Sequence, residues 1–344
     1  MPTAIQSLPN SPEAESPRNP FGFRPDAHSR VRQLDRETRE ALATSLERLQ
    51  ARAGTLLPQV FDVAEVCSQI RAGRVSPGAF AAYFEMVPAL QAGKRDLAAD
   101  CWRRIGARPV EAATLRCQPV RVEELGEDAA RFERLLSIGW REQGIFAPPT
   151  DADWLPFERD AQQALALLAE ALPVWHAEVE SLLLRIYGAL PADGTGRGFS
   201  GASSRMVWGA IFINMRRHPD RLAIASSIVH EATHQKLFGL SQSQPLTENP
   251  PHERYVSPLR SEPRPMEGVY HATYVAARLA LFNAQLRESS ALSPHERETV
   301  SLAVPSLKQR FENGRASVEK DGKLGTLARE LMDSAAREVA ELSD

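Results

Sequence analysis

The spacing of apolar residues changes near residue 30. Residues 1–30 hold six prolines and little apolar content, so they cannot bury enough surface to offset their ordering entropy, and we interpret them as a flexible arm. Helical spacing then begins with Leu42, Leu46 and Leu49. Further helices are expected at about 59–70, 78–92 and 95–106. The pattern predicts a mostly helical N-terminal section over residues 31–150, with strand character only at 110–125.

Residues 151–344 combine helices with one strong strand. Two long helices are expected after Pro156, the second over about 173–190. Residues 206–214 are the most strand-like segment because they are apolar and rich in β-branched side chains. The fold class that follows is α+β, mainly α-helical.

The next helix is expected over residues 219–239, where Pro219 suits the first turn and Gly239 suits the C-cap. Residues 241–267 are polar and rich in proline. A loop of this length is uncommon inside a compact domain and is often functional. Later helices are expected at about 266–286, from the capping box of Ser293 and Glu296 onward, and at about 324–342.

One motif in the helix at 219–239 carries chemistry, the run His230-Glu231-Ala232-Thr233-His234. Residues four apart lie on the same face of a helix, so the two imidazoles can bind one divalent transition metal. Glu231 is the candidate catalytic residue, because it can reach a metal-bound water or a substrate group. The motif predicts a zincin-like metal core in residues 151–344, which we expect to be the catalytic domain.

The third metal ligand is expected on the helix at 266–286. No histidine follows His234 at the short spacing that metzincins use. His271 lies in an apolar helix 37 residues after His234 (271 minus 234), and gluzincin-type sites place their third ligand, normally Glu, on such a second helix. We predict that His230, His234 and His271 are the metal ligands. Glu267, one turn before His271, is the alternative.

Two arginines beside prolines precede this helix. Arg260 ends the run Ser-Pro-Leu-Arg, and Arg264 lies between two prolines. Proline restricts the backbone next to each guanidinium, which suits bidentate binding of a carboxylate. Solvated surface charges are the alternative interpretation.

Composition and charge narrow the function classes. A net charge of -3 gives no bias toward nucleic acid or an anionic membrane, so neither is expected as a partner. No run of apolar residues is long enough for a membrane span, and the N-terminus has no apolar signal-peptide core. The three cysteines are widely spaced, which is typical of reduced thiols. We therefore expect a cytoplasmic protein.

The order of the motifs resembles that of a known family. HExxH is followed by SPxR at 257–260, PRP at 263–265 and GVxHxxY at 268–274. This combination resembles the bacterial HExxH-motif peptide-modification proteins. These proteins occur beside ribosomally made peptide precursors and are viewed as 2-oxoglutarate-dependent peptide β-hydroxylases. The resemblance covers about residues 197–286.

The resemblance implies a cofactor set and a substrate. Fe(II) would be held by the three histidines, 2-oxoglutarate would be the co-substrate with O2, and a ribosomal precursor peptide would be hydroxylated at a side-chain Cβ. Arg260 or Arg264 would bind the distal carboxylate of 2-oxoglutarate. A third imidazole departs from the usual set of two histidines and one carboxylate, which keeps Glu267 open. Glu231 would orient ligands or substrate rather than activate water.

Two other functions fit the same residues. In a zinc metallopeptidase Glu231 would act as general base on a metal-bound water, and imidazole ligands suit zinc as well as iron. A glutamate as third ligand would favour this peptidase, whereas His271 and an arginine facing the metal would favour the oxygenase. The chain could also be a non-catalytic, metal-containing peptide-binding subunit. Whichever of these functions holds, the helical N-terminal section is a candidate for binding a leader peptide.

Overall fold

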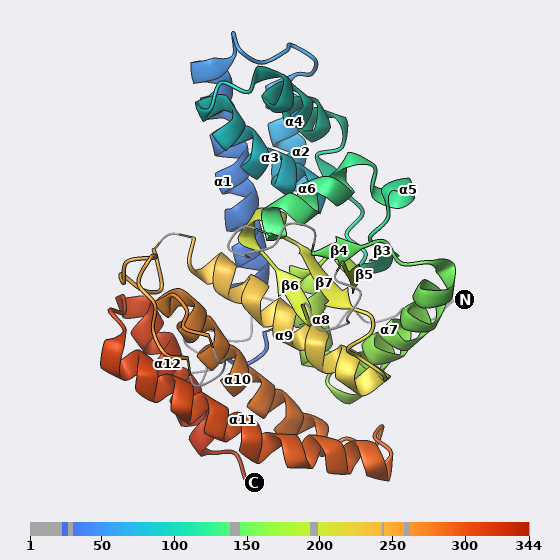
Figure 1. The fold of residues 1–344 in the computed structure, drawn as a ribbon, viewed down its shortest axis with the longest axis vertical. Coiled ribbons are helices and arrows are strands. Elements are labelled where there is room, and N and C mark those ends of the chain that lie inside the picture. Colours follow the sequence, from blue (N-terminus) through green and yellow to red (C-terminus); the bar gives the residue numbers. More distant parts are fainter. Residues whose placement is uncertain are drawn as a thin grey trace, which may run out of the picture.

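The computed structural model describes residues 23–26, 30–137, 145–192, 199–242, 244–257 and 262–343. Within these residues twelve α-helices surround a small mixed sheet, which confirms the expected α+β, mainly helical class. The N-terminal helices lie on one side of the sheet and the C-terminal helices on the other (Figure 1). None of the helices in these ranges is long and apolar enough to cross a membrane.

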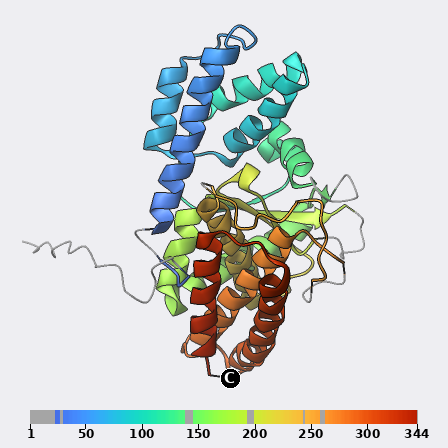
Figure 2. The ribbon, with the colours of Figure 1, turned by 90° about the vertical axis from the view of Figure 1, so that its left-hand side faces the viewer.

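The N-terminal section is helical, as expected. It contains α1 (Arg30–Ala53), α2 (Val63–Ala72), α3 (Pro77–Gln91), α4 (Arg95–Ala107), the short α5 (Val122–Leu125) and α6 (Glu127–Leu136). Side chains of Asp62 and Ser76 cap α2 and α3. Strand β1 (Arg74–Val75) pairs antiparallel with β2 (Val110–Glu111). The long α1 also reaches past this section and packs on helices of the opposite layer (Figure 2).

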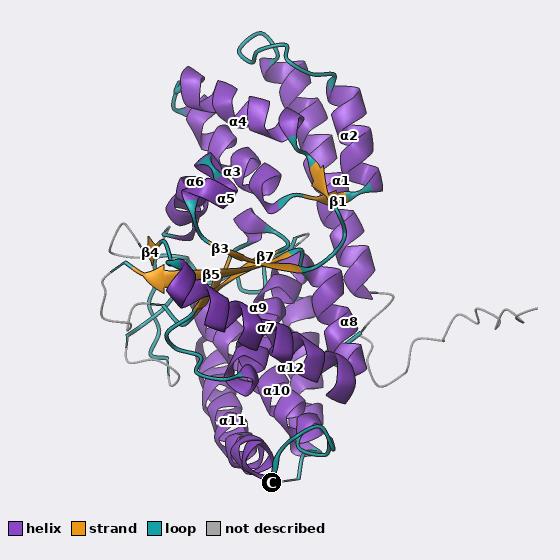
Figure 3. Cartoon of the chain, turned by 90° about the vertical axis from the view of Figure 1, so that its right-hand side faces the viewer, coloured by secondary structure: helices purple, strands orange, loops and turns teal. Residues whose placement is uncertain are grey.

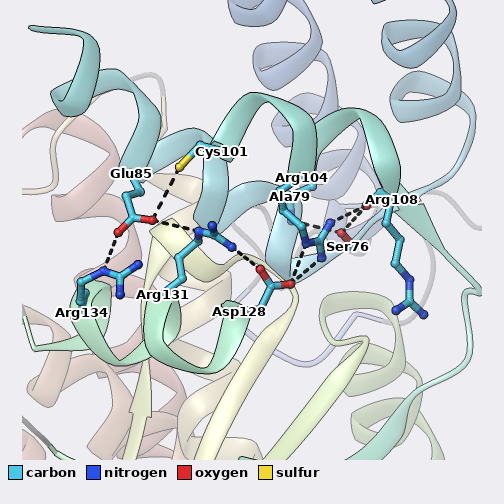
Figure 4. Close-up of polar contacts among 9 residues, drawn as sticks. All are labelled: Ser76, Ala79, Glu85, Cys101, Arg104, Arg108, Asp128, Arg131 and Arg134. Carbon is cyan, nitrogen blue, oxygen red and sulfur yellow. Dashed lines mark hydrogen bonds and ion pairs between the residues drawn. The ribbon is translucent and has the colours of Figure 1, made fainter. Parts of the chain in front are cut away.

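Buried ion pairs join three helices of this section (Figure 4). Glu85 of α3 accepts hydrogen bonds from Arg131 (3.0 Å) and Arg134 (2.6 Å) of α6. Asp128 of α6 pairs with Arg104 of α4 at 2.6 Å. Burial alone would raise the pKa of Glu85, but the two arginines outweigh burial and lower it. These pairs fix α6 against α3 and α4.

The main sheet has the strand order β3 (Arg116–Pro119), β5 (Arg185–Pro191), β7 (Ala210–Asn214) and β6 (Gly201–Ser203). The first three strands are parallel, and β6 runs antiparallel to β7 at the edge. Strand β4 (Phe146–Ala147) pairs antiparallel with the end of β5.

Side chains of the two central strands alternate between two hydrophobic layers. Ile186 and Ile211 belong to the layer that contains α7 (Asp151–Ala171) and α9 (Arg221–Leu240). Tyr187 and Phe212 belong to the other layer, where Phe132 of α6 packs on both rings, at centroid distances of 5.4 and 5.6 Å. Helices therefore cover the sheet on both faces (Figure 3).

Two predictions about segments that form the central strands need correction. The helix expected over 173–190 ends early, because α8 spans Pro173–Leu182 and the next residues form the central strand β5. An apolar run without alternation is compatible with a buried helix and with a buried parallel strand. Here the run forms a strand because it pairs with β3 on one side and with β7 on the other. The strand expected over 206–214 begins only at Ala210, after the 3₁₀ turn η1 (Arg205–Val207) and Gly209, whose φ is 82°.

The remaining helices match the expected pattern, except at the two ends of α9. This helix begins at Arg221 after its N-cap Asp220, so Pro219 lies before the helix and not in its first turn. Helices α10 (Met266–Leu286), α11 (Pro294–Asp321) and α12 (Thr326–Ala340) follow, and α11 has the expected capping box. Gly239 is wrong as a C-cap, because it lies inside α9. A Cβ there would lie 2.9 Å from the Trp208 ring, so the glycine permits a close approach of side chains.

The predicted arm overlaps the core at its end. Residues 1–22 and 27–29 lie outside the described residues, but residues 23–26 pack against the protein. Phe23 is fully buried. The six prolines of this segment therefore do not predict how its last residues pack.

Candidate metal centre

Helix α9 presents the HExxH motif beside the sheet. Asp220 caps the helix by accepting a hydrogen bond from the backbone of Ala223 at 2.8 Å. Gln235 fixes the middle of α9 to the sheet, because its amide donates to the carbonyl of Ala210 at 3.0 Å. His230 and His234 lie one turn apart with ring centroids 5.1 Å from each other. The predicted common face of the two histidines is therefore present.

His271 of α10 faces His234. The two Nδ1 atoms are 3.1 Å apart, and the rings lie nearly parallel, 15° apart. Two imidazole nitrogens in such contact can share one proton or one metal ion. Two ligand nitrogens that each lie about 2.1 Å from one ion are separated by roughly 3.0–3.4 Å.

The surroundings of His271 also suit a ligand. Its side chain is 6% exposed, and burial lowers its pKa to about 4, so the ring is neutral at pH 7. Its Nε2 has no hydrogen-bond partner among the described residues. A neutral, buried imidazole has the donor chemistry that a metal ligand needs, and the nitrogen placed to bind an ion shared with His234 is Nδ1, not the unpartnered Nε2.

A complete ligand set is not formed. Among the described residues, no three His, Cys, Asp or Glu side chains are arranged to hold a metal ion. His234 and His271 provide two facing donors, whereas the His230 side chain is 41% exposed. The donor types therefore fit iron or zinc, and the His230 side chain is partly open to solvent.

Glu231 is held by the edge strand. Its Oε2 accepts a hydrogen bond from the Ser203 hydroxyl at 2.6 Å, and its side chain is 6% exposed. A Cβ at Gly201 would overlap the other carboxylate oxygen. His230 Nε2 lies 3.9 Å from Glu231 Oε1. The carboxylate is thus positioned between β6 and the first histidine of the motif.

The other predicted site residues differ in their positions. Glu267 is exposed, so the structure brings His271 and not Glu267 to His234. The backbone of Arg264 pairs with Tyr255 through hydrogen bonds of 2.8 and 3.0 Å, and its aliphatic stem lies over Gly268, at the first turn of α10. Arg260 lies outside the described residues.

The sequence did not single out Gly201 and Ser203 as site residues. Both belong to a three-residue strand. Residues two apart in a strand lie on the same face, and this spacing was the only sequence signal that could have placed the two residues together. No protein-family model and no curated protein matches this chain. The resemblance in motif order therefore stays a prediction.

Proposed function

We propose that this protein is a metal-dependent enzyme that modifies a peptide, and specifically an Fe(II)- and 2-oxoglutarate-dependent hydroxylase of a ribosomally made peptide. The zincin-like core is part of this proposal, with His230, His234 and His271 as ligands. When bound together with 2-oxoglutarate and O2, Fe(II) supplies the oxidation that converts a C–H bond at a side-chain Cβ into C–OH, with succinate and CO2 as co-products.

The observation that carries the proposal is the contact between His234 and His271. The second helix presents an imidazole to the motif, where a gluzincin peptidase would present a glutamate, and Glu267 points to solvent. Imidazole ligands that leave open positions suit an ion that must also bind a keto acid and O2. This favours the oxygenase over the peptidase.

The position of Glu231 supports the same choice. One oxygen of the Glu231 carboxylate accepts the hydrogen bond from the Ser203 hydroxyl at 2.6 Å, so this side chain is engaged with strand β6. Glu231 therefore joins α9 to strand β6. We assign it the role of orienting His230 and the substrate.

Strand β6 supports a peptide as substrate. The backbone N–H of Asn214 donates to the carbonyl of Ser200, so by alternation Ala202 is the hydrogen-bonded residue of β6. The N–H and C=O groups of Gly201 and Ser203 then face the outer edge, where no other described strand pairs. An extended peptide can add to this edge as a further strand, directly beside Glu231.

Arg264 is the described residue that suits the distal carboxylate of 2-oxoglutarate. Its backbone is fixed by the pairing with Tyr255, and its stem lies over Gly268, the residue of α10 three positions before His271. A bidentate guanidinium–carboxylate contact contributes about 1.5–3 kcal/mol. Arg260 is the second candidate from the same loop.

The test is anaerobic reconstitution with Fe(II), followed by 2-oxoglutarate, O2 and a precursor peptide, with succinate as the readout. We expect peptide-stimulated succinate that His230→Ala abolishes. Arg264→Ala should raise the KM for 2-oxoglutarate by about tenfold or more, with Arg260→Ala measured beside it. Arg254→Ala is the matched control, because this exposed arginine of the same loop bonds only to nearby carbonyls in the described structure. Zinc-dependent peptide cleavage that requires Glu231 would instead establish the peptidase.

A further inference from the structure

Three buried charged side chains form a cluster between α8, α9 and α10. Glu178, Lys236 and Arg278 are at most 2% exposed. Lys236 Nζ donates to one oxygen of Glu178 at 2.6 Å, and Arg278 pairs with the other oxygen. The ring of Trp175 stacks on Arg278, with 4.6 Å between the guanidinium carbon and the ring centroid. Two cations thus share one carboxylate inside the protein.

Residues 23–26, which we name the N-terminal strap, bind to this cluster through their backbone. The carbonyl of Phe23 accepts from Arg278 at 2.6 Å, and that of Arg24 accepts from Lys236 at 3.2 Å. The N–H of Asp26 donates to Glu178 at 3.0 Å. Each charged side chain of the cluster therefore has a main-chain partner in the strap.

The strap also fills an apolar position. The Phe23 ring is fully buried and packs edge-to-face on Tyr274, with centroids 5.5 Å apart. Tyr274 follows His271 by three residues on α10, and Arg278 follows four residues later, so all three share one side of the helix. On α9, Lys236 lies two residues after His234. The strap therefore contacts the same two helices that carry the facing histidines.

We infer that the Glu178–Lys236–Arg278 cluster is a main-chain binding site whose ligand is the protein's own N-terminal strap, and that its occupation positions α9 and α10 so that His234 and His271 face each other. The ligand is an extended backbone with an aromatic side chain at its first residue. Without it, each of the two buried cations would lose its carbonyl acceptor and keep only Glu178, and a cavity would replace the Phe23 ring, so the helices would have to repack. The strap residues are positioning residues and touch no substrate.

The test uses the full-length protein with Phe23→Ala, and Arg24→Ala as the matched control. Arg24 is the neighbouring strap residue whose partly exposed side chain pairs with Glu338 of α12 (2.7 Å), and the control keeps its carbonyl. Hydrogen exchange is measured across α9 and α10, and Co(II) binding is titrated by absorption. We expect Phe23→Ala to speed exchange around His234 and His271 and to weaken Co(II) binding by about tenfold or more. Arg24→Ala should change both by less than about twofold.

The outcomes separate this inference from the proposed function. The Co(II) measurement rests on the proposed metal site, whereas the exchange measurement does not. If wild-type protein binds no Co(II), the metal function is refuted and local exchange in α9 and α10 still decides the role of the strap. Exchange that rises equally throughout the protein, with Co(II) affinity unchanged, would overturn the inference. Phe23→Leu, which keeps most of the apolar volume, gives the same comparison if Phe23→Ala does not fold.

Discussion

Replacing Glu178 by glutamine and, separately, Lys236 by methionine changes the charge of one buried cluster in opposite directions. Within the cluster, two cations face one carboxylate, a sum of +1. Glu178→Gln raises this sum to +2 and removes the charged acceptor of Lys236, Arg278 and the Asp26 N–H. Leaving buried charges without their partner costs about 3–5 kcal/mol.

Lys236→Met should cost less. It leaves Glu178 and Arg278 as a balanced pair and keeps an unbranched side chain of similar volume in the same position. A swap of this kind costs under about 1.5 kcal/mol, and the carbonyl of Arg24 loses one hydrogen bond worth about 1 kcal/mol. We expect a total of about 1–2 kcal/mol. Burial, followed by the charge of Arg278, already lowers the pKa of Lys236 to about 8, which shows that this cation is poorly stabilised.

Urea denaturation at pH 7, followed by circular dichroism, measures both variants. The free energy of unfolding should fall at least about 1 kcal/mol further for Glu178→Gln than for Lys236→Met, out of a total near 5–15 kcal/mol. Equal losses, or a larger loss for Lys236→Met, would refute the charge arithmetic. The cluster would then act through packing alone.

Three further predictions concern single contacts. Gly239→Ala should lower the free energy of unfolding by about 1 kcal/mol in a denaturant titration. Overpacking against the buried Trp208 costs about 1–3 kcal/mol, whereas the helix gains only about 0.5–1 kcal/mol from alanine. A more stable variant would contradict the packing role of the glycine. Glu296→Gln should lower Tm at pH 7 but not near pH 2. The hydrogen bond from Arg221 holds the pKa of Glu296 at about 2, below its ordinary 4.5. The contribution of the ionised Glu296 to the stability of the fold is therefore complete above about pH 5 and is lost as the pH falls from about 4.5 toward 2. A Tm difference that persists at pH 2 would contradict this linkage. Gly201→Ala should displace the carboxylate of the HExxH glutamate. Succinate formation should then fall by about tenfold or more, with Tm nearly unchanged. Full activity would show that the position of this carboxylate is unimportant.

Helices whose signals are local could be predicted from the sequence. Helix α11 begins at the capping box of Ser293, as expected, because caps and helical periodicity act within a few residues. The same local geometry places His230 and His234 on one face before any tertiary contact exists. The shared face of the two motif histidines was therefore predicted, and their ring centroids lie 5.1 Å apart.

Strand β5 and Gly239 show where local signals fail. The run after Leu182 is apolar without alternation, so its sequence is compatible with a longer α8 or with a buried strand, and pairing with β3 and β7 selects the strand. Gly239 is the residue type expected at a C-cap, yet the reason for a glycine here is the close approach of the Trp208 ring. In both cases the deciding neighbour is distant in sequence.

The sequence alone determined which residues could carry the chemistry and on which helices they lie. Tertiary structure decided which of them meet, because contacts between distant segments leave no periodic signal. His234 and His271 are 37 residues apart, Ser203 and Glu231 are 28 apart, and Lys236 binds the carbonyl of a residue 212 positions earlier. Only the packing of α9 on the sheet, of α10 on α9, and of the strap on both helices brings these groups together.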